Sequence, residues 1–199
     1  MLFIVVVLAP WGAVAAERSI LVVGDSLSAA YGLPQQRGWV ALLGERIKRE
    51  RLDYSVVNAS ISGDTTGGGL ARIDRLLAQH KPAVVVLELG GNDGLRGLPI
   101  AEMRKNLAAM VERSRKAGAR VLLVGVYIPP NYGPDYTKGF FDSFGELAKR
   151  YHTALVPYIM QDFALKPEFF QPDRIHPTVE AQPLMMEQVW KALRPLLKG

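Results

Sequence analysis

Apolar runs of strand length alternate with amphipathic stretches of helical spacing along almost the whole chain. The first run, Ile20–Val23, is continuous and rich in β-branched residues, and residues 83–89 form the most apolar run beyond the N-terminal segment. Strands of a parallel sheet read as continuous apolar runs because helices cover both of their faces. The alternation therefore predicts an α/β fold, a three-layer α/β/α, doubly wound parallel sheet of about five strands with right-handed crossovers.

The same pattern gives approximate bounds for the elements. We expect strands over residues 20–24, 54–59, 83–89, 120–127 and 154–158, and helices over residues 37–51, 69–79, 100–116, 138–151 and 179–197. Irregular segments lie between them at residues 24–36, 60–68, 90–99, 129–137 and 169–177. The first four of these follow the first four strands, so they open on the edge where such folds bind ligands. No repeat or linker divides residues 17–199, which indicates a single domain.

The N-terminal segment has the features of a secretion signal. Residues 2–8 are apolar, and small residues at cleavage spacing follow at residues 13–16. The apolar stretch is shorter than the roughly 20 residues that a membrane-spanning helix needs. No Lys or Arg precedes it, so an uncleaved membrane anchor stays the alternative. We expect a signal peptide over residues 1–16 and a periplasmic or secreted mature protein.

Composition narrows the class of protein and its partners. The net charge of +5 comes without a basic cluster interleaved with aromatic residues, which argues against a nucleic-acid partner. The chain has no cysteine, and its three histidines form no metal-binding motif. The glycine run at residues 67–69 is not followed by Gly-Lys-Ser/Thr, as a phosphate-binding loop would require. We expect neither a metal nor a cofactor, whereas the positive net charge leaves an anionic membrane surface and an acidic substrate as alternative partners.

Polar groups suited to acyl chemistry follow three of the predicted strands. Ser26 comes directly after the first strand in Gly-Asp-Ser, Gly63 lies in the second irregular segment, and Asn92 lies in the third. Each motif alone is also typical of a turn or of a helix N-terminus. Their occurrence on one edge of the sheet favours a shared site.

Among the histidines, His176 is the best candidate for a catalytic base. His80 ends a predicted helix, where a cation compensates the helix dipole, and His152 precedes a strand on the opposite edge. His176 has a carboxylate, Asp173, three residues earlier. A hydroxyl nucleophile needs a base that an acid orients, so Ser26, Asp173 and His176 are candidates for a triad.

Four sequence blocks together resemble the SGNH (GDSL) hydrolase family. The blocks are Gly24-Asp25-Ser26-Leu27, Gly63 between Ser62 and Asp64, Gly90-Gly91-Asn92-Asp93, and Asp173-x-x-His176. The resemblance covers residues 19–197 and implies a flavodoxin-like fold. It implies that Ser26 is the nucleophile, that His176 is the general base and acid, and that Asp173 orients His176. The implied oxyanion hole combines the backbone N–H groups of Ser26 and Gly63 with the side-chain amide of Asn92.

The resemblance also implies the substrates. We expect a serine esterase and thioesterase that hydrolyses acyl-CoA, lysophospholipids and aryl esters through an acyl-enzyme. We expect it to be a monomer in transient contact with membrane lipid. A carbohydrate O-deacetylase on the same fold and a non-catalytic acyl- or glycan-binding protein are the alternatives, because fold does not fix substrate.

Two loops are expected to form the crevice for the acyl chain. One is the loop after Asn92, with Leu95, and the other is the Pro129–Tyr136 loop, with Tyr132. Glycines in the first loop allow it to close over a substrate. One position departs from the family pattern, because Arg174 stands where relatives usually carry Gly. A cation there acts on His176, meets an anionic substrate or lies in solvent.

Overall fold

The computed structural model describes residues 18–198 and contains a five-stranded parallel sheet. Its strands run in the spatial order β2-β1-β3-β4-β5. They are β1 (Arg18–Gly24), β2 (Tyr54–Asn58), β3 (Val84–Glu88), β4 (Arg120–Val124) and β5 (Ala154–Val156). All four strand pairs are parallel, which confirms the predicted fold class. The expected signal peptide lies outside the described residues.

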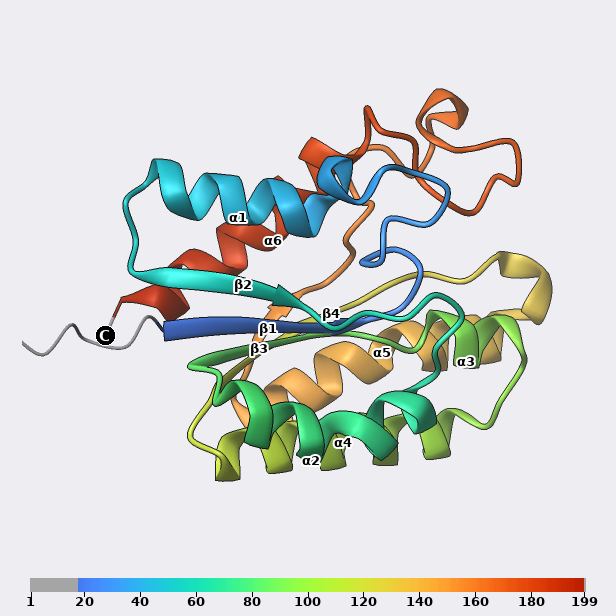
Figure 1. Ribbon diagram of the computed structural model, residues 1–199. Coiled ribbons are helices and arrows are strands. Elements are labelled where there is room, and N and C mark those ends of the chain that lie inside the picture. Colours follow the sequence, from blue (N-terminus) through green and yellow to red (C-terminus); the bar gives the residue numbers. More distant parts are fainter. Residues whose placement is uncertain (1–17, 199) are drawn as a thin grey trace, which may run out of the picture.

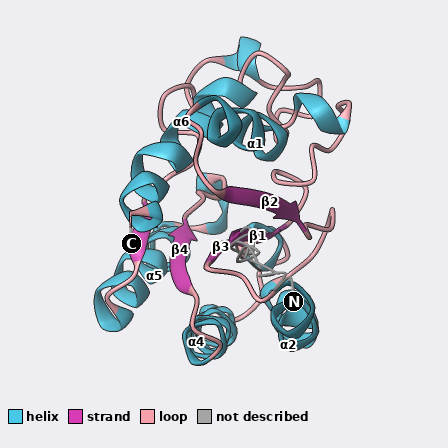
Figure 2. Ribbon diagram, turned by 60° about the vertical axis from the view of Figure 1, so that its left-hand side comes forward, coloured by secondary structure: helices cyan, strands magenta, loops and turns pink. Residues whose placement is uncertain are grey.

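Helices cover both faces of the sheet, as the apolar strands require (Figure 1). Helices α1 (Trp39–Arg49) and α6 (Gln182–Leu193) lie on one face. Helices α2 (Thr66–His80), α4 (Ile100–Lys116) and α5 (Pro134–Tyr151) lie on the other, and Figure 2 shows the same layers from another side. Within residues 18–198, none of the helices combines the length with the apolar content that a membrane span requires.

The two central strands form the rigid part of the core. Ile20–Val23 of β1 and residues 84–87 of β3 are all fully buried. Burial of one such aliphatic side chain contributes about 1.5–3 kcal/mol. The pairing of β1 with β3 continues to the last residue of each strand, where Gly24 faces Glu88. The loop that carries Ser26 therefore starts from a fixed point of the core.

Two helices begin earlier than predicted, because a capping residue or a proline fixes the first turn. Helix α2 begins at Thr66, three residues before the predicted start, because the Thr65 hydroxyl accepts the N–H of Gly68 and so caps the helix. Helix α5 begins at Pro134, four residues early, because proline suits the first turn of a helix.

Other boundaries are also corrected. A short helix, α3 (Gly91–Leu95), lies in the segment that was expected to be irregular. The last helix is shorter than predicted, since α6 ends at Leu193 and a 3-10 turn with Pro195 follows. Strand β4 ends at Val124, three residues before the predicted end at residue 127.

Candidate active site

Ser26, His176 and Asp173 form a chain of hydrogen bonds at the carboxyl edge of the sheet. The Ser26 Oγ lies 2.9 Å from Nε2 of His176, and Nδ1 of His176 lies 2.7 Å from Oδ2 of Asp173. Ser26 follows β1, whereas the other two residues belong to the loop before α6. With the proton on Nδ1 donated to Asp173, Nε2 is free to accept the Ser26 hydroxyl proton. This is the geometry of an activated nucleophile.

Asp173 is held as a carboxylate by donors from its own loop. Its Oδ1 accepts the backbone N–H groups of Ile175 at 2.9 Å and His176 at 3.0 Å. Partial burial acts to raise the pKa of Asp173, but these N–H groups and the His176 ring outweigh it and lower the pKa to about 2. The group stays ionised at neutral pH and can stabilise a protonated His176.

The nucleophile turn needs a glycine just before it. A Cβ on Gly24 would lie 2.6 Å from the Ser28 Oγ and 2.9 Å from Oε2 of Glu88, closer than real Cβ contacts. Asp25, at the turn itself, is buried and accepts the N–H of Leu27 at 3.0 Å. These contacts fix the backbone on either side of Ser26.

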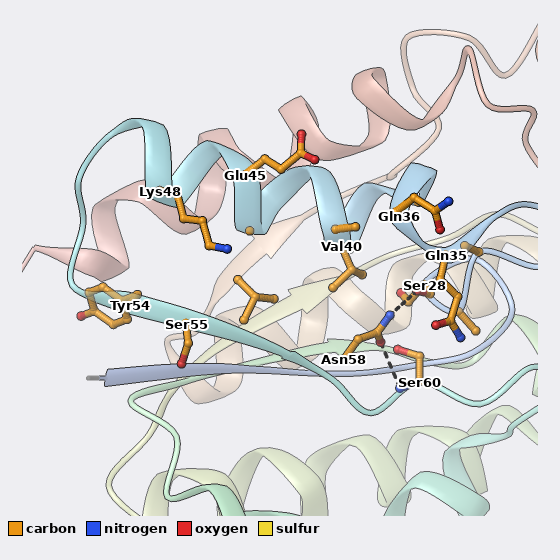
Figure 3. Close-up of a pocket in the computed structure, with 16 residues that line it drawn as sticks. Ser28, Gln35, Gln36, Val40, Glu45, Lys48, Tyr54, Ser55, Asn58 and Ser60 are labelled. Atoms are coloured by element: carbon orange, nitrogen blue, oxygen red, sulfur yellow. Dashed lines mark hydrogen bonds between the residues drawn. The ribbon is translucent and has the colours of Figure 1, made fainter. Parts of the chain in front are cut away.

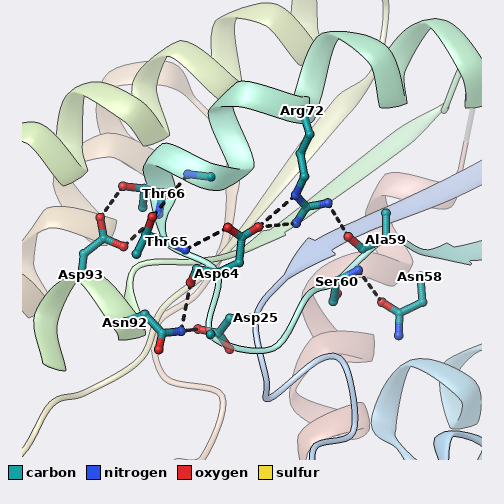
Figure 4. A network of polar contacts seen from close by, with 12 residues as sticks. Asp25, Asn58, Ala59, Ser60, Asp64, Thr65, Thr66, Arg72, Asn92 and Asp93 are labelled. Carbon is teal, nitrogen blue, oxygen red and sulfur yellow. Dashed lines mark hydrogen bonds and ion pairs between the residues drawn. The ribbon is translucent and has the colours of Figure 1, made fainter. Parts of the chain in front are cut away.

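Asn92 links three loops of the site (Figure 4). Its side-chain amide donates to the carbonyl oxygen of Asp64 at 2.9 Å and to Oδ2 of Asp25 at 3.1 Å. Gly63 lies beside this link with a φ of +79°, a conformation that favours glycine. Among residues 18–198, no backbone hydrogen bond takes up the N–H of Ser26 or of Gly63. Two backbone donors are thus free for an oxygen of a substrate.

An ion pair and several hydrogen bonds hold the Gly63 loop in place from behind. Arg72 of α2 forms an ion pair with Asp64 at 2.8 Å and donates to the carbonyl of Ala59 at the start of the loop. Asp93, next to Asn92, accepts both the N–H and the hydroxyl of Thr66, at 2.8 Å and 2.5 Å. The loops that carry Gly63 and Asn92 are therefore tied together through the start of α2.

Two buried carboxyl groups, Asp25 and Glu88, lie behind the nucleophile. Burial raises the pKa of Asp25 to about 6, against the lowering effect of its donors and of His176. Burial, and then the charge of Asp25, raise the pKa of Glu88 well above its ordinary value. Glu88 is fully buried, and its Oε2 accepts the Ser28 hydroxyl at 2.6 Å. Burial therefore favours the protonated form of both groups, and Glu88, which is fully buried and also faces the charge of Asp25, is held above its ordinary pKa by both effects.

The Glu88 side chain gives a pH-dependent prediction for stability. An acid whose pKa is higher in the folded state makes folding less favourable as the pH rises above its unfolded value. Glu88→Gln keeps an oxygen for the Ser28 hydroxyl and removes this effect. We expect the stability of the variant relative to the parent to rise as the pH rises above the unfolded pKa of Glu88, by at most about 1.4 kcal/mol per pH unit, measured by urea unfolding. Glu102→Gln, at an exposed position, is the control, and a pH-independent difference between the Glu88→Gln variant and the parent would contradict the assignment.

A cavity of about 620 Å³ opens next to Ser26 and His176. Its walls are mostly apolar, and they include Leu95, Val126, Ile128, Pro129, Pro130, Tyr158, Met160, Leu165 and Phe170. Arg174 also lines it, with a φ of +59°. Tyr132 does not lie on the cavity wall, but its hydroxyl donates to the carbonyl of Leu95 at 2.6 Å. Tyr132 therefore supports the wall from behind.

A second, more polar groove lies between α1 and the edge strand β2 (Figure 3). It measures about 500 Å³, and Gln35, Lys48, Ser55 and Asn58 are among its lining residues. Neither Ser26 nor His176 lines it. The amide of Asn58 donates to the carbonyl of Ser28 at 2.8 Å, so this side of the molecule supports the nucleophile turn.

Several residues of the site were not named from the sequence. The ring of Tyr31 lies against that of His176, with centroids 4.4 Å apart, and Arg72 holds Asp64. A wall of the cavity comes from residues 158–170, which follow β5. For Arg72, the only signal in the sequence was its position, one turn into the helix predicted over residues 69–79. The other contacts depend on how the loops fold back.

Comparisons with known proteins agree with this geometry. The model of the GDSL-like Lipase/Acylhydrolase family matches residues 22–183. The chain is 54% identical to Esterase TesA of Pseudomonas aeruginosa, over 92% of this chain and 91% of that protein. It is 42% identical to Thioesterase 1/protease 1/lysophospholipase L1 of Escherichia coli (strain K12), over 98% and 92%. The crystal structure of esterase EstA from Pseudoalteromonas sp., inhibited by monoethylphosphonate, matches with a TM-score of 0.87 and 45% identity, over 92% and 100%.

Proposed function

The chain belongs to the GDSL-like Lipase/Acylhydrolase family and is a serine hydrolase that acts on ester bonds, and we propose that it hydrolyses acyl esters and thioesters by means of Ser26, His176 and Asp173. The observation that carries the proposal is the unbroken chain of contacts from Ser26 Oγ to His176 and Asp173. Acyl-CoA, lysophospholipids and aryl esters are the proposed substrates. The names of the relatives, which include esterase, arylesterase, thioesterase and lysophospholipase, support this range.

The proposed reaction has two stages. The Ser26 oxygen forms a bond with the acyl carbon while its proton moves to Nε2 of His176, and a tetrahedral intermediate results. His176 then gives the proton to the departing alcohol or thiol as the bond to it breaks, which leaves an acyl-enzyme. Water repeats the sequence, with its proton passing through His176, and releases the acid and free Ser26. Asp173 stabilises His176 while it is protonated.

The backbone N–H groups of Ser26 and Gly63 and the side-chain amide of Asn92 are the proposed oxyanion hole. They would donate hydrogen bonds to the oxyanion of the tetrahedral intermediate in each of the two stages. Donors that are already in place stabilise the charge as it forms, without reorganisation. In this structure the side-chain amide of Asn92 donates hydrogen bonds to the carbonyl oxygen of Asp64 and to Oδ2 of Asp25. The longer contact, at 3.1 Å to Asp25, is the one that an oxyanion would share.

A panel of four substrates tests the proposed specificity. We expect hydrolysis of a p-nitrophenyl ester, an acyl-CoA and a lysophospholipid, and little release of acetate from an acetylated sugar. The apolar cavity wall favours long acyl groups over a sugar. A reversed order would favour the carbohydrate O-deacetylase, and absence of hydrolysis of all four would favour a binding protein.

The acyl chain is proposed to occupy the cavity lined by Leu95, Pro129 and Pro130. Leu95→Ala shortens a side chain of this wall and so enlarges the cavity. Tyr132→Phe removes the hydrogen bond that holds the Leu95 carbonyl. We expect each change to shift the ratio of kcat/KM between long and short p-nitrophenyl esters, about tenfold for Leu95→Ala. Ala78→Gly on the exposed face of α2 is the control. An unchanged chain-length profile in both variants would place the acyl chain elsewhere.

Arg174 is proposed to contact anionic substrates at the cavity. Its left-handed backbone explains why the family usually carries Gly here, since a side chain in this conformation costs about 1–2 kcal/mol. Arg174→Gly therefore is not expected to destabilise the fold. We expect it to lower the kcat/KM ratio of acyl-CoA over a neutral aryl ester several-fold at low salt, and less at high salt. A ratio that does not move at low salt would make Arg174 a solvated loop residue.

The last part of the proposal concerns export of the protein from the cytoplasm. We propose a signal peptide over residues 1–16, with one hydrolase domain over residues 17–199 acting as a monomer in the periplasm or outside the cell. Small residues at positions 13–16 support cleavage there. The intact mass of the protein recovered from a periplasmic fraction measures the cleavage site. Recovery of the full chain from the membrane fraction would instead identify an anchor.

A further inference from the structure

The Tyr31 side chain lies against His176, although about half of it is exposed to solvent. The centroids of the two rings are 4.4 Å apart, and the ring planes are tilted by 36°. Tyr31 is 51% exposed, so it is not part of the hydrophobic core. Burial in the core therefore does not explain why an aromatic ring is placed at this position.

The backbone on both sides of Tyr31 has a left-handed conformation. The φ angle is +57° at Ala30 and +73° at Gly32. A residue with a side chain, such as Ala30, adopts this conformation at a cost, and such strain is found most often at functional sites. A Cβ on Gly32 would lie 2.3 Å from Oε1 of Gln171, so the chain also passes close to the loop before α6. The turn therefore places Tyr31 at a cost in backbone strain.

Hydrogen bonds join Tyr31 to both halves of the triad. Its backbone N–H donates to the carbonyl of Ser26 at 3.1 Å, and its carbonyl accepts the side-chain amide of Gln171 at 2.9 Å. The same amide donates to the carbonyl of Pro177 at 3.0 Å, and the backbone N–H of Gln171 donates to the carbonyl of His176 at 2.7 Å. Tyr31 is therefore fixed relative to the nucleophile turn and to the loop that carries His176.

The Tyr31 ring adds a contact that the hydrogen bonds of His176 do not supply. Both nitrogens of the His176 ring are already engaged, one by Asp173 and the other by Ser26. A neighbouring ring against the face of the imidazole restricts its tilt. An aromatic face within about 6 Å also attracts a cation. His176 becomes a cation when it takes the Ser26 proton, so the attraction is strongest in that state.

We propose that Tyr31 is a positioning residue that holds the His176 imidazole between Ser26 and Asp173 and stabilises it while it is protonated. The inference rests on the proposed function, because the proton transfer that it assists is the one from Ser26 to His176. Tyr31 itself gains and loses no proton. It does not line the cavity proposed for the acyl chain, so its effect is expected on kcat and not on KM.

The first test compares two replacements of Tyr31 in the hydrolysis of a p-nitrophenyl ester. Tyr31→Leu keeps an apolar side chain but removes the aromatic face, and we expect kcat to fall roughly 3- to 30-fold with little change in KM. Tyr31→Phe keeps the aromatic face and is the matched control, with kcat close to that of the parent. Thermal melts show that both variants are folded.

The second test asks whether Tyr31 acts through His176. In the His176→Ala background, Tyr31→Leu should cost little, because the group that it assists is already absent. Single-turnover release of p-nitrophenol at high enzyme concentration measures this slow reaction. An equal loss in both backgrounds would overturn the proposal, since Tyr31 would then support the turn or contact the substrate directly.

Other results would also overturn it. A parental kcat for Tyr31→Leu would show that the ring contact has no role, and an equal loss in Tyr31→Phe and Tyr31→Leu would assign the effect to the hydroxyl. A raised KM with an unaltered kcat would make Tyr31 a contact of the bound substrate. Ser26→Ala is measured beside these variants. An active Ser26→Ala protein contradicts the proposed mechanism, whereas an inactive one with a fully active Tyr31→Leu protein contradicts only the role of Tyr31.

Discussion

Ser26→Ala is expected to lower kcat by roughly 10⁴–10⁶-fold, and His176→Ala by a similar factor. The reason is geometric, because Ser26 Oγ and His176 Nε2 lie 2.9 Å apart and act as one unit. The double variant should therefore lose little more than either single variant. Steady-state hydrolysis of a p-nitrophenyl ester measures all three.

Two control experiments accompany this prediction. His152→Ala changes an exposed histidine at the opposite edge of the sheet and should leave kcat unaltered. Thermal melts of the Ser26 and His176 variants should match that of the parent, since neither side chain belongs to the core. Near-parental hydrolysis by a pure Ser26→Ala protein would exclude Ser26 as the nucleophile.

Asn92→Ala is expected to lower kcat by about 10²–10³-fold and to change KM much less. The Asn92 amide is held in one place by Asp64 and Asp25, so its loss removes a donor that is already in position for the oxyanion. Asn131→Ala, at an exposed position, serves as the control. A raised KM with an unaltered kcat would instead make Asn92 a contact of the bound substrate.

Combining Asp25→Asn with Asn92→Ala shows whether Asp25 acts on catalysis through Asn92 or only supports the fold. Asp25→Asn leaves one oxygen for two donors, Leu27 N–H and the Asn92 amide, and so should also lower kcat. If Asp25 acts through Asn92, this change should cost little in the Asn92→Ala background. An equal loss in both backgrounds would mean that Asp25 only supports the fold.

The sheet could be predicted because its signal is local. Continuous apolar runs such as Ile20–Val23 gave the strands, and their alternation with helices gave the layers. Helix starts were harder to predict, since the start of α2 depends on the Thr65 cap and that of α5 on Pro134, which follows Gly133. Short α3 lacks the periodic apolar pattern by which longer helices are found.

The residues of the candidate site that belong to sequence motifs could be predicted, whereas the contacts around them could not. Ser26, Asp173 and His176 were named from their sequence setting, and the structure places them within hydrogen-bond distance. The Asp25–Glu88 pair and the Tyr31 contact with His176 depend on the register of β1 with β3 and on loop packing, which no local pattern encodes. The role given to Tyr132 also changes, from lining the crevice to supporting Leu95.

The central claim is that Ser26 is the nucleophile of an acyl-enzyme, and covalent labelling tests it most directly. An organophosphonate reacts with a serine that a neighbouring base activates, and the phosphorus stays bound to its oxygen. We expect the intact mass of the parent to rise by one phosphonyl group, with the label on the peptide that contains Ser26. The Ser26→Ala protein should take up none, and His176→Ala should react far more slowly. A label on another residue, or an active enzyme that stays unlabelled, would contradict the assignment.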